Sequence, residues 1–247
     1  MPEIPTLLEM LQAGVHFGHK VSKWHPKMKP YIFGERSDIH IVNLELTAQK
    51  LKEALDFLEE TTAAGGVVLF IGTKDQAKEI VKRHAQDSGM PYVISRWLGG
   101  TFTNFKTIKG VIDKFRDLKV KQSSGALAKY TKKEQLNFQK EIEKLEGLVG
   151  GIESLTKLPE AIFIVDVRTE KTAVAEARKR RVPIVAICDT NVNPEEVGYP
   201  IPANDDAVKS IELLVGLAAG AIKEGRQEFE TKKSVAAEKP AVKEEKK

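Results

Sequence analysis

A basic segment near the N-terminus, residues 16–31 (HFGHKVSKWHPKMKPY), has the residue types that bind nucleic acid. It contains no acidic residue, and its two prolines predict an extended stretch on the surface. Its lysines can neutralise phosphates, and its aromatic and imidazole rings can stack on unpaired bases. The alternative is a solvated loop whose rings hold it against the core. We favour RNA contact, with the candidate residues His16, His19, Lys20, Lys23, Trp24, His25, Lys27 and Lys29.

Two further basic patches point the same way. Residues 96–109 (RWLGGTFTNFKTIK) contain no acid, and the Gly99-Gly100 pair permits close backbone approach. The run 178–181 lies at the predicted end of a helix, where cations also stabilise the helix dipole, so it is weak support alone. Separate patches on a chain of net charge +4 favour RNA contact at several places. The candidates here are Arg96, Trp97, Lys106, Lys109, Arg178, Lys179, Arg180 and Arg181.

The residues that could support catalysis form no recognisable constellation. Gly72-Thr73-Lys74 follows a predicted strand, as a phosphate-binding turn would, but neither GxxxxGK[ST] nor GxGxxG is present. Cys188 closes an apolar strand and is interpreted as a core residue. Asp189 and Asp205 fall near strand ends, and a hard-cation site there is a minority hypothesis. We therefore predict no enzyme, no cofactor and no metal, with a nucleotide- or sugar-phosphate-binding α/β enzyme as the alternative.

The amino-acid composition indicates the class of protein to which these residues belong. The chain has 247 residues, 41% of them hydrophobic and 30% charged, as is typical of a globular protein. A single cysteine excludes an internal disulfide and fits a reducing cytoplasm. We expect a soluble cytoplasmic protein with no membrane partner and no small-molecule substrate.

Apolar runs alternating with amphipathic helices predict an α/β fold with a parallel sheet covered on both faces. The predicted strands of this sheet are 67–71, 92–95, 161–167, 183–188 and 199–201, and two further short strands are expected at 31–33 and 39–42. The predicted helices are 6–13, 47–63, 74–88, 169–181 and 205–223.

The stretch between residues 96 and 159 breaks this alternation. Two apolar stripes at helical spacing flank a polar turn, which predicts an antiparallel helical hairpin sealed like a coiled coil. The expected domains are an α/β sheet domain (1–102 and 150–226), an inserted hairpin (103–149) and a disordered charged tail (227–247). The stripes comprise Phe105, Ile108, Ile112, Phe115 and Leu118, and Phe138, Ile142, Leu145 and Val149.

Five blocks of sequence stand out, namely AGVHFGHK (13–20), WHPKMKPYIFGERSDIHIVNL (24–44), RWLGGTFTNFKTI (96–108), PEAIFIVDVRTEKTAVAEARKRRVP (159–183) and DTNVNPEEVGYPIPANDDAVKSI (189–211). They cover much of residues 4–224, and together they are highly specific. The chain resembles, in these blocks, the bacterial form of the universal small-subunit ribosomal protein S2 family. Small departures are His25 where asparagine is expected, Thr101-Phe102 where Met-Leu is usual, and Cys188 where an aliphatic residue is common.

The resemblance implies a flavodoxin-like sheet of about five parallel strands, with the hairpin inserted as in the bacterial or organellar branch. It implies a structural constituent of the small ribosomal subunit that binds ribosomal RNA between head and body. It also implies a role in recruiting the multi-OB-fold, mRNA-binding ribosomal protein. These expectations come from the resemblance alone.

Overall fold

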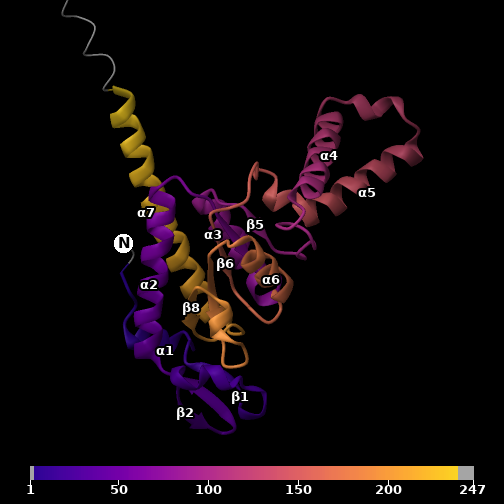
Figure 1. Cartoon of the computed structure of the whole chain (residues 1–247). Helices are drawn as coiled ribbons and strands as arrows, with labels where there is room; N and C mark the ends of the chain where they lie inside the picture. Colours follow the sequence, from indigo (N-terminus) through magenta and orange to yellow (C-terminus); the bar gives the residue numbers. More distant parts are fainter. Residues whose placement is uncertain (1–2, 239–247) are drawn as a thin grey trace, which may run out of the picture.

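The computed structural model describes residues 3–238 and contains a five-stranded parallel sheet at its centre (Figure 1). The strand order is β5-β4-β6-β7-β8. The predicted α/β class and parallel sheet are confirmed. The strands are β4 (Val68–Ile71), β5 (Tyr92–Val93), β6 (Ala161–Ile164), β7 (Ile184–Cys188) and β8 (Tyr199–Pro202).

The strands β4, β6 and β7 have continuous apolar sequences, as is typical of strands in the interior of a parallel sheet. Every residue of β4, β6 and β7 is buried, because helices cover both faces of the sheet. After β4 the chain adds β5 on one side, and it then crosses back to place β6 on the other side of β4. Such a reversal opens a crevice outside the carboxyl ends of the strands, where α/β proteins bind ligands.

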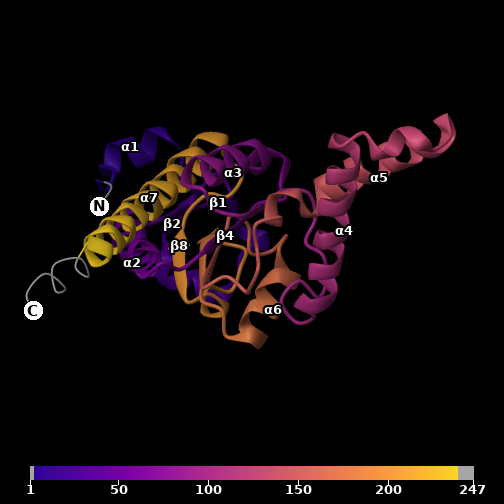
Figure 2. The same cartoon turned by 90° about the horizontal axis from the view of Figure 1, so that it is seen from above.

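One hydrophobic cluster lies on each face of the sheet. Figure 2 shows the helices on the two sides, with α2, α3 and α7 on one and α4 and α6 on the other. Phe70 and Phe163 point into the first, under the helices α2, α3 and α7. Leu69 and Ile162 point into the second, under α6 and α4. The helices are α1 (Leu7–Gln12), α2 (Leu44–Ala63), α3 (Asp75–Ser88), α4 (Phe105–Ser123), α5 (Lys132–Val149), α6 (Lys171–Arg180) and α7 (Val208–Glu238).

The helices α4 and α5 carry the two predicted apolar stripes. They meet where they join the sheet and separate towards the segment that connects them (Figure 1). A capping box begins α5 at Thr131, and another begins α1 at Thr6. Phe115 is fully buried in the same cluster as the sheet residue Leu69, so the stripe continues into the core under the sheet. Packing as a coiled coil stays a prediction.

The N-terminal region forms a second, antiparallel sheet of order β1-β3-β2. The prediction of an extended, irregular stretch at 16–31 was wrong, because residues 17–20 pair with β3 and the rest folds into short 3-10 helices. Gly18 permits β1 to lie close to Thr190, since a Cβ there would lie 2.6 Å from the Thr190 side chain. The elements are β1 (Phe17–Lys20), β2 (Ile32–Arg36) and β3 (Ile39–Val42), with 3-10 helices at Val21–Lys23, Pro26–Tyr31, Ala126–Lys129, Gly150–Ile152 and Pro194–Glu196.

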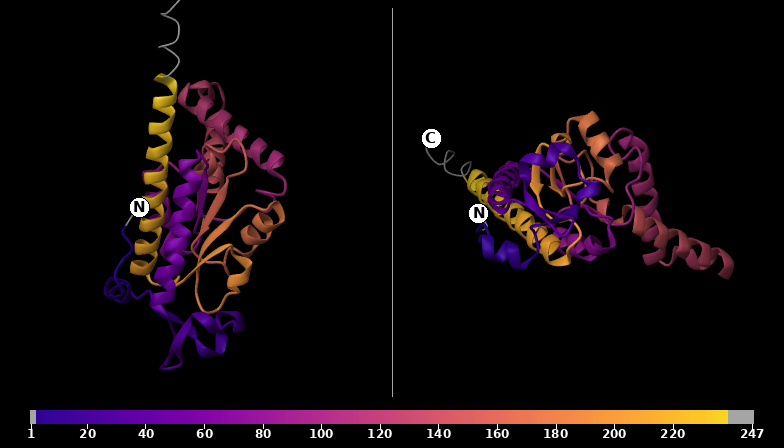
Figure 3. Two further views of the ribbon diagram at one scale, coloured as in Figure 1. Left: turned by 60° about the vertical axis from the view of Figure 1, so that its left-hand side comes forward. Right: turned by 90° about the horizontal axis from the view of Figure 1, so that it is seen from below.

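The C-terminal helix is longer than predicted. α7 lies along α2 and extends to Glu238, so residues 227–238, which we assigned to a disordered tail, are helical (Figure 3). Phe229 is half-buried and lies against Gly65, and the ion pair between Arg226 and Glu230 joins adjacent turns. Because Phe229 is a single apolar anchor in a charged stretch, the sequence shows no apolar periodicity from which this part of the helix could be predicted. The remainder of the predicted tail, 239–247, lies outside the described residues.

Candidate functional site

The basic segment 16–31 is fixed to the carboxyl edge of the parallel sheet by backbone hydrogen bonds. The amide of His25 donates to the carbonyl of Thr190 over 2.8 Å, and that of His19 donates to the Thr190 hydroxyl over 2.9 Å. Met28, within the segment, has a fully buried side chain. Because Thr190 follows β7 closely, the segment covers the edge where the strands end.

All four lysines in this segment are exposed, and three of them have no acidic partner among the described residues. Lys20, Lys23 and Lys29 are exposed, and no ion pair among the described residues involves them. Lys27 differs, because its Nζ lies 2.8 Å from the carboxylate of Glu195. The structure thus brings three uncompensated cations onto one anchored segment, which suits them to contact phosphates.

The rings of the segment are less exposed than its lysines. Trp24 is half-buried, with its ring 5.3 Å from that of His40. His25 Nδ1 accepts the amide of Lys27 over 3.2 Å and so caps the second 3-10 helix. His16 is half-buried against Phe17. These rings therefore help to hold the segment against the rest of the protein. This is the role that the alternative explanation in the sequence analysis gave to them.

The second predicted patch packs against a buried acid that sequence reasoning missed. Glu176 of α6 is 8% exposed and accepts the amides of Gly100 and Phe102 over 2.7 and 2.9 Å. Trp97, a predicted RNA contact, is buried and donates its indole N–H to Glu176 over 3.3 Å. Arg96, Lys106 and Lys109 remain exposed. The glycine-rich loop 98–103 could have indicated such an acid, because its backbone amides need an acceptor when they are buried.

Burial would by itself raise the pKa of Glu176, but hydrogen bonds from backbone amides outweigh it and hold the pKa below its ordinary value of 4.5. The carboxylate's contribution to stability is therefore complete above pH 4.5 and is lost as the pH falls through the folded-state pKa. Glu176→Gln should lower the free energy of unfolding at pH 7 by about 3 kcal/mol, because buried amides lose a charged acceptor.

Urea unfolding of the wild-type and E176Q proteins at pH 7 and at acid pH checks this expectation. The difference between them should shrink below pH 4.5. Glu146→Gln, at an exposed position of α5, serves as the control. A difference that stays constant with pH would contradict the role given to the charge.

The third predicted patch lies at the opposite edge of the sheet. Residues 178–181 are all exposed and form the end of α6. Because α6 connects the parallel strands β6 and β7, it runs against them and ends where they begin. Arg181 adopts the left-handed conformation that closes the helix. The basic patches therefore do not form one continuous groove.

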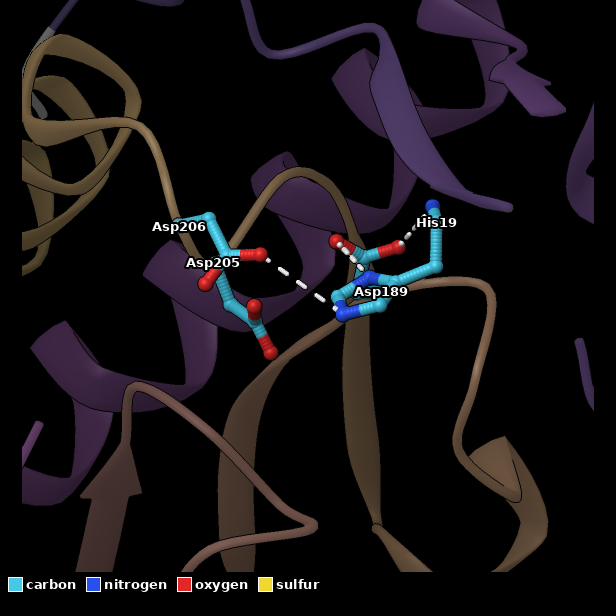
Figure 4. A group of neighbouring side chains, drawn as sticks. All are labelled: His19, Asp189, Asp205 and Asp206. Carbon is cyan, nitrogen blue, oxygen red and sulfur yellow. Dashed lines mark hydrogen bonds and ion pairs between the residues drawn. The ribbon is translucent and has the colours of Figure 1, made fainter. Parts of the chain in front are cut away.

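An acidic group occupies the carboxyl edge of the parallel sheet (Figure 4). Lys74 follows β4, and its Nζ lies 2.8 Å from Asp205 Oδ1, 2.6 Å from Asp206 Oδ1 and 3.1 Å from Asp166 Oδ2. The surrounding strands end at these aspartates because parallel strands deliver their carboxyl ends to one edge. His19 reaches the same place from β1, with Nδ1 3.0 Å from Asp189 Oδ2.

The charges in this group perturb one another. Burial and the charges of Asp166 and Asp189 raise the pKa of Asp205 to about 7. A hydrogen bond to Asp189 raises the pKa of His19. Burial would lower the pKa of Lys74, but the neighbouring aspartates raise it well above its usual range. The hypothesised pair of Asp189 and Asp205 is thus brought together, with a histidine that we had assigned to RNA.

This edge is unsuited to a phosphate. The amide of Thr73 donates to Glu170 over 3.1 Å, and the ammonium of Lys74 is held by aspartates. Gly72 is needed for packing, since a Cβ there would lie 2.8 Å from Val81. Two donors that a phosphate would need, the Thr73 amide and the Lys74 ammonium, are thus committed to carboxylates, so the alternative of a sugar-phosphate or nucleotide enzyme gains no support. Cys188 is fully buried, and burial raises the pKa of its thiol far above the usual range.

Comparison with protein families gives one finding that covers most of the chain. The family model described as ribosomal protein S2 matches residues 10–225. Within residues 3–238, no helix has both the length and the apolar character needed to cross a membrane.

Proposed function

Because the chain belongs to the ribosomal protein S2 family, a family of structural ribosomal proteins, we propose that it binds small-subunit ribosomal RNA between head and body. We also propose that it helps recruit the multi-OB-fold, mRNA-binding protein of the same subunit. The observation that supports RNA contact best is the anchored segment 16–31, with Lys20, Lys23 and Lys29 exposed and outside every ion pair among the described residues.

The other exposed cations extend this proposed interface. Lys106 and Lys109 lie on the first turns of α4, and the run 178–181 ends α6. We assign them to separate RNA contacts, because they lie on different sides of the molecule from the anchored segment. Phosphate contacts of this kind position a protein on folded RNA without reading its sequence. A cytoplasmic location on the ribosome follows from the same proposal.

Residues 103–149 form, in this proposal, an inserted arm that contacts partners. Its outer part exposes apolar side chains that a protein or RNA surface could cover, namely Val120 (64% exposed), Leu136 (51%) and Tyr130 (38%). Large exposed apolar residues that gather on a projecting element are typical of interaction sites. The division of the chain at residues 103 and 149 stays a prediction, because the base of α4 packs in the same cluster as the sheet.

Small subunits assembled without this chain test the recruitment. They should retain much less of the multi-OB-fold protein, because its proposed docking partner is missing, and adding the purified chain should restore it. The measurement is quantitative mass spectrometry of subunits collected from sucrose gradients. Equal amounts of the multi-OB-fold protein with and without the chain would refute the recruitment role and leave RNA binding untouched.

A further inference from the structure

We propose that a cavity at the amino edge of the parallel sheet binds one unpaired nucleotide of the ribosomal RNA. This inference rests on the proposed function and adds a contact outside the basic patches. The cavity has a volume of about 370 Å³, within the range of pockets that hold small ligands. It lies opposite the edge where the strands end, because its lining includes residues just before β4 (Gly66, Val67), β5 (Met90, Pro91) and β6 (Leu158).

The C-terminal part of α7 forms one wall of the cavity. Gly65 and Gly89 both have positive φ angles, of 80° and 67°, at turns that α7 approaches closely. A Cβ on Gly65 would lie 2.6 Å from the ring of Phe229, and one on Gly89 would overlap the guanidinium of Arg226. Close packing of α7 against these two turns therefore sets the shape of the wall.

The floor of the cavity suits the flat ring of a base. Phe229 is half-buried and lines the cavity together with Met90, Pro91 and Leu155. Met90 and Leu155 are 8% and 5% exposed, so the floor is continuous with the hydrophobic interior. Aromatic side chains stack on any base, since every base has a π-face, and unpaired bases are the ones free to do so.

The rim supplies groups for the phosphate and the ribose. Lys233 is exposed and makes no ion pair with any residue that the structure describes. Lys157 pairs with Glu160 over 2.6 Å but is 68% exposed, so its ammonium can turn to a phosphate. The hydroxyls of Ser154 and Thr156 are exposed and have no hydrogen-bond partner in the described part of the chain. They are available to a base edge or to a ribose 2′-hydroxyl.

The surroundings of the cavity favour a polyanion. The exposed basic run 178–181 leads into β7, which lies beside β6 and begins at the same edge. The amide of Ile162 donates to the carbonyl of Pro183 over 3.0 Å, so the two strands are adjacent where they begin. The acids at the cavity, Glu160 and Glu230, are each paired with a cation. An RNA strand that crosses this edge would therefore meet mainly uncompensated positive charge.

The same cavity offers little to an extended peptide. Peptides bind to sheets chiefly by pairing with the free backbone groups of an edge strand. Here the amides of Gly65 and Gly66 both donate to carbonyls of α2 over 2.9 Å, and that of Val67 donates to Glu160 over 2.7 Å. A base that stacks needs few backbone partners, so it fits the cavity better than a peptide does.

The test irradiates salt-washed small subunits that have rebound the full chain, and mass spectrometry then maps nucleotide adducts on the chain. One adduct should fall within residues 154–158 or 226–233. Phe229→Leu keeps an apolar side chain against Gly65 but removes the ring, so this adduct should fall roughly fivefold or more. Circular dichroism confirms that the variant is folded.

The cations of the rim have a separate readout. Replacing Lys157 and Lys233 together by glutamine should weaken binding to the subunit by roughly tenfold at low salt, and should lower the slope of log affinity against log salt by about 1 to 2. Lys232→Gln is the matched control, since Lys232 is the next residue of α7 but lines a different groove and pairs with Glu228. It should bind as the wild type does.

Adducts within residues 16–31 and none at the cavity would overturn the inference and leave the proposed function intact. Equal binding by the wild type and the double variant would also overturn it. So would cross-linking of Lys233 to a neighbouring ribosomal protein by an amine-reactive reagent, in place of a nucleotide adduct. A wild-type chain that does not bind the subunit at all would refute the proposed function, and the inference with it.

Discussion

Replacing Lys20, Lys23 and Lys29 together by glutamine should weaken binding to the small subunit by roughly tenfold or more at low salt. It should also reduce the slope of log affinity against log salt by about 2 to 3, because each lost phosphate contact releases about one counterion fewer. These side chains are exposed, so the substitutions should leave the fold intact.

The measurement is binding of the purified chain to salt-washed small subunits across a series of KCl concentrations. Lys27→Gln is the matched control from the same segment, since Lys27 already pairs with Glu195 and should change the slope little. Equal slopes for the triple variant and the wild type would show that the segment does not meet phosphates. The segment would then be the solvated loop of the alternative explanation.

Replacing Phe115 by alanine should lower the free energy of unfolding by about 3–5 kcal/mol. Phe115 of α4 is fully buried in the cluster that also contains Leu69 and Ile162 of the sheet. Truncation there removes a ring from the core under the sheet, so one cooperative transition should shift as a whole. Leu136→Ala, at a half-exposed position of α5, should change the same quantity by about 0.5 kcal/mol or less.

Denaturant unfolding followed by circular dichroism and by tryptophan fluorescence checks this result, because Trp97 lies in the same cluster. Coincident curves that move together in F115A would mean that the base of the arm belongs to the sheet domain. Loss of α4 and α5 at lower denaturant, with an unshifted second transition, would instead support the division at residues 103 and 149. Replacing residues 106–147 by a short linker would then leave a folded sheet domain.

The central strands could be predicted from the sequence because their burial is complete. Where every residue is inside, as in β6 and β7, the apolar run is unambiguous. β1 could not be found this way. Its sequence, Phe17–Lys20, is half polar, and its pairing depends on β3 and on Thr190 far along the chain.

The exposure of the lysines could be predicted from the sequence better than the surroundings of the tryptophan and histidine rings. Lysines are exposed almost wherever they fall, so Lys20 and Lys23 lie in solvent as expected. Tryptophan is ambiguous, and Trp97 turned out to be a buried donor to Glu176. His19 has a lysine beside it in the sequence but aspartates around it in space, a difference that only the tertiary structure reveals.

The bonds between His19 and residues 189–190 span 170 and 171 positions of the chain. During synthesis the N-terminal segment is made first, yet its anchor does not exist until residues 189 and 190 of the 247 have been translated. At about 5–20 residues per second this delay is about 10–30 s. The segment proposed to meet RNA is therefore among the first parts to leave the translating ribosome and among the last to take its final shape. A chain truncated before Asp189 would lack a docked N-terminus, so stable seating on RNA would be reserved for chains that extend beyond this anchor.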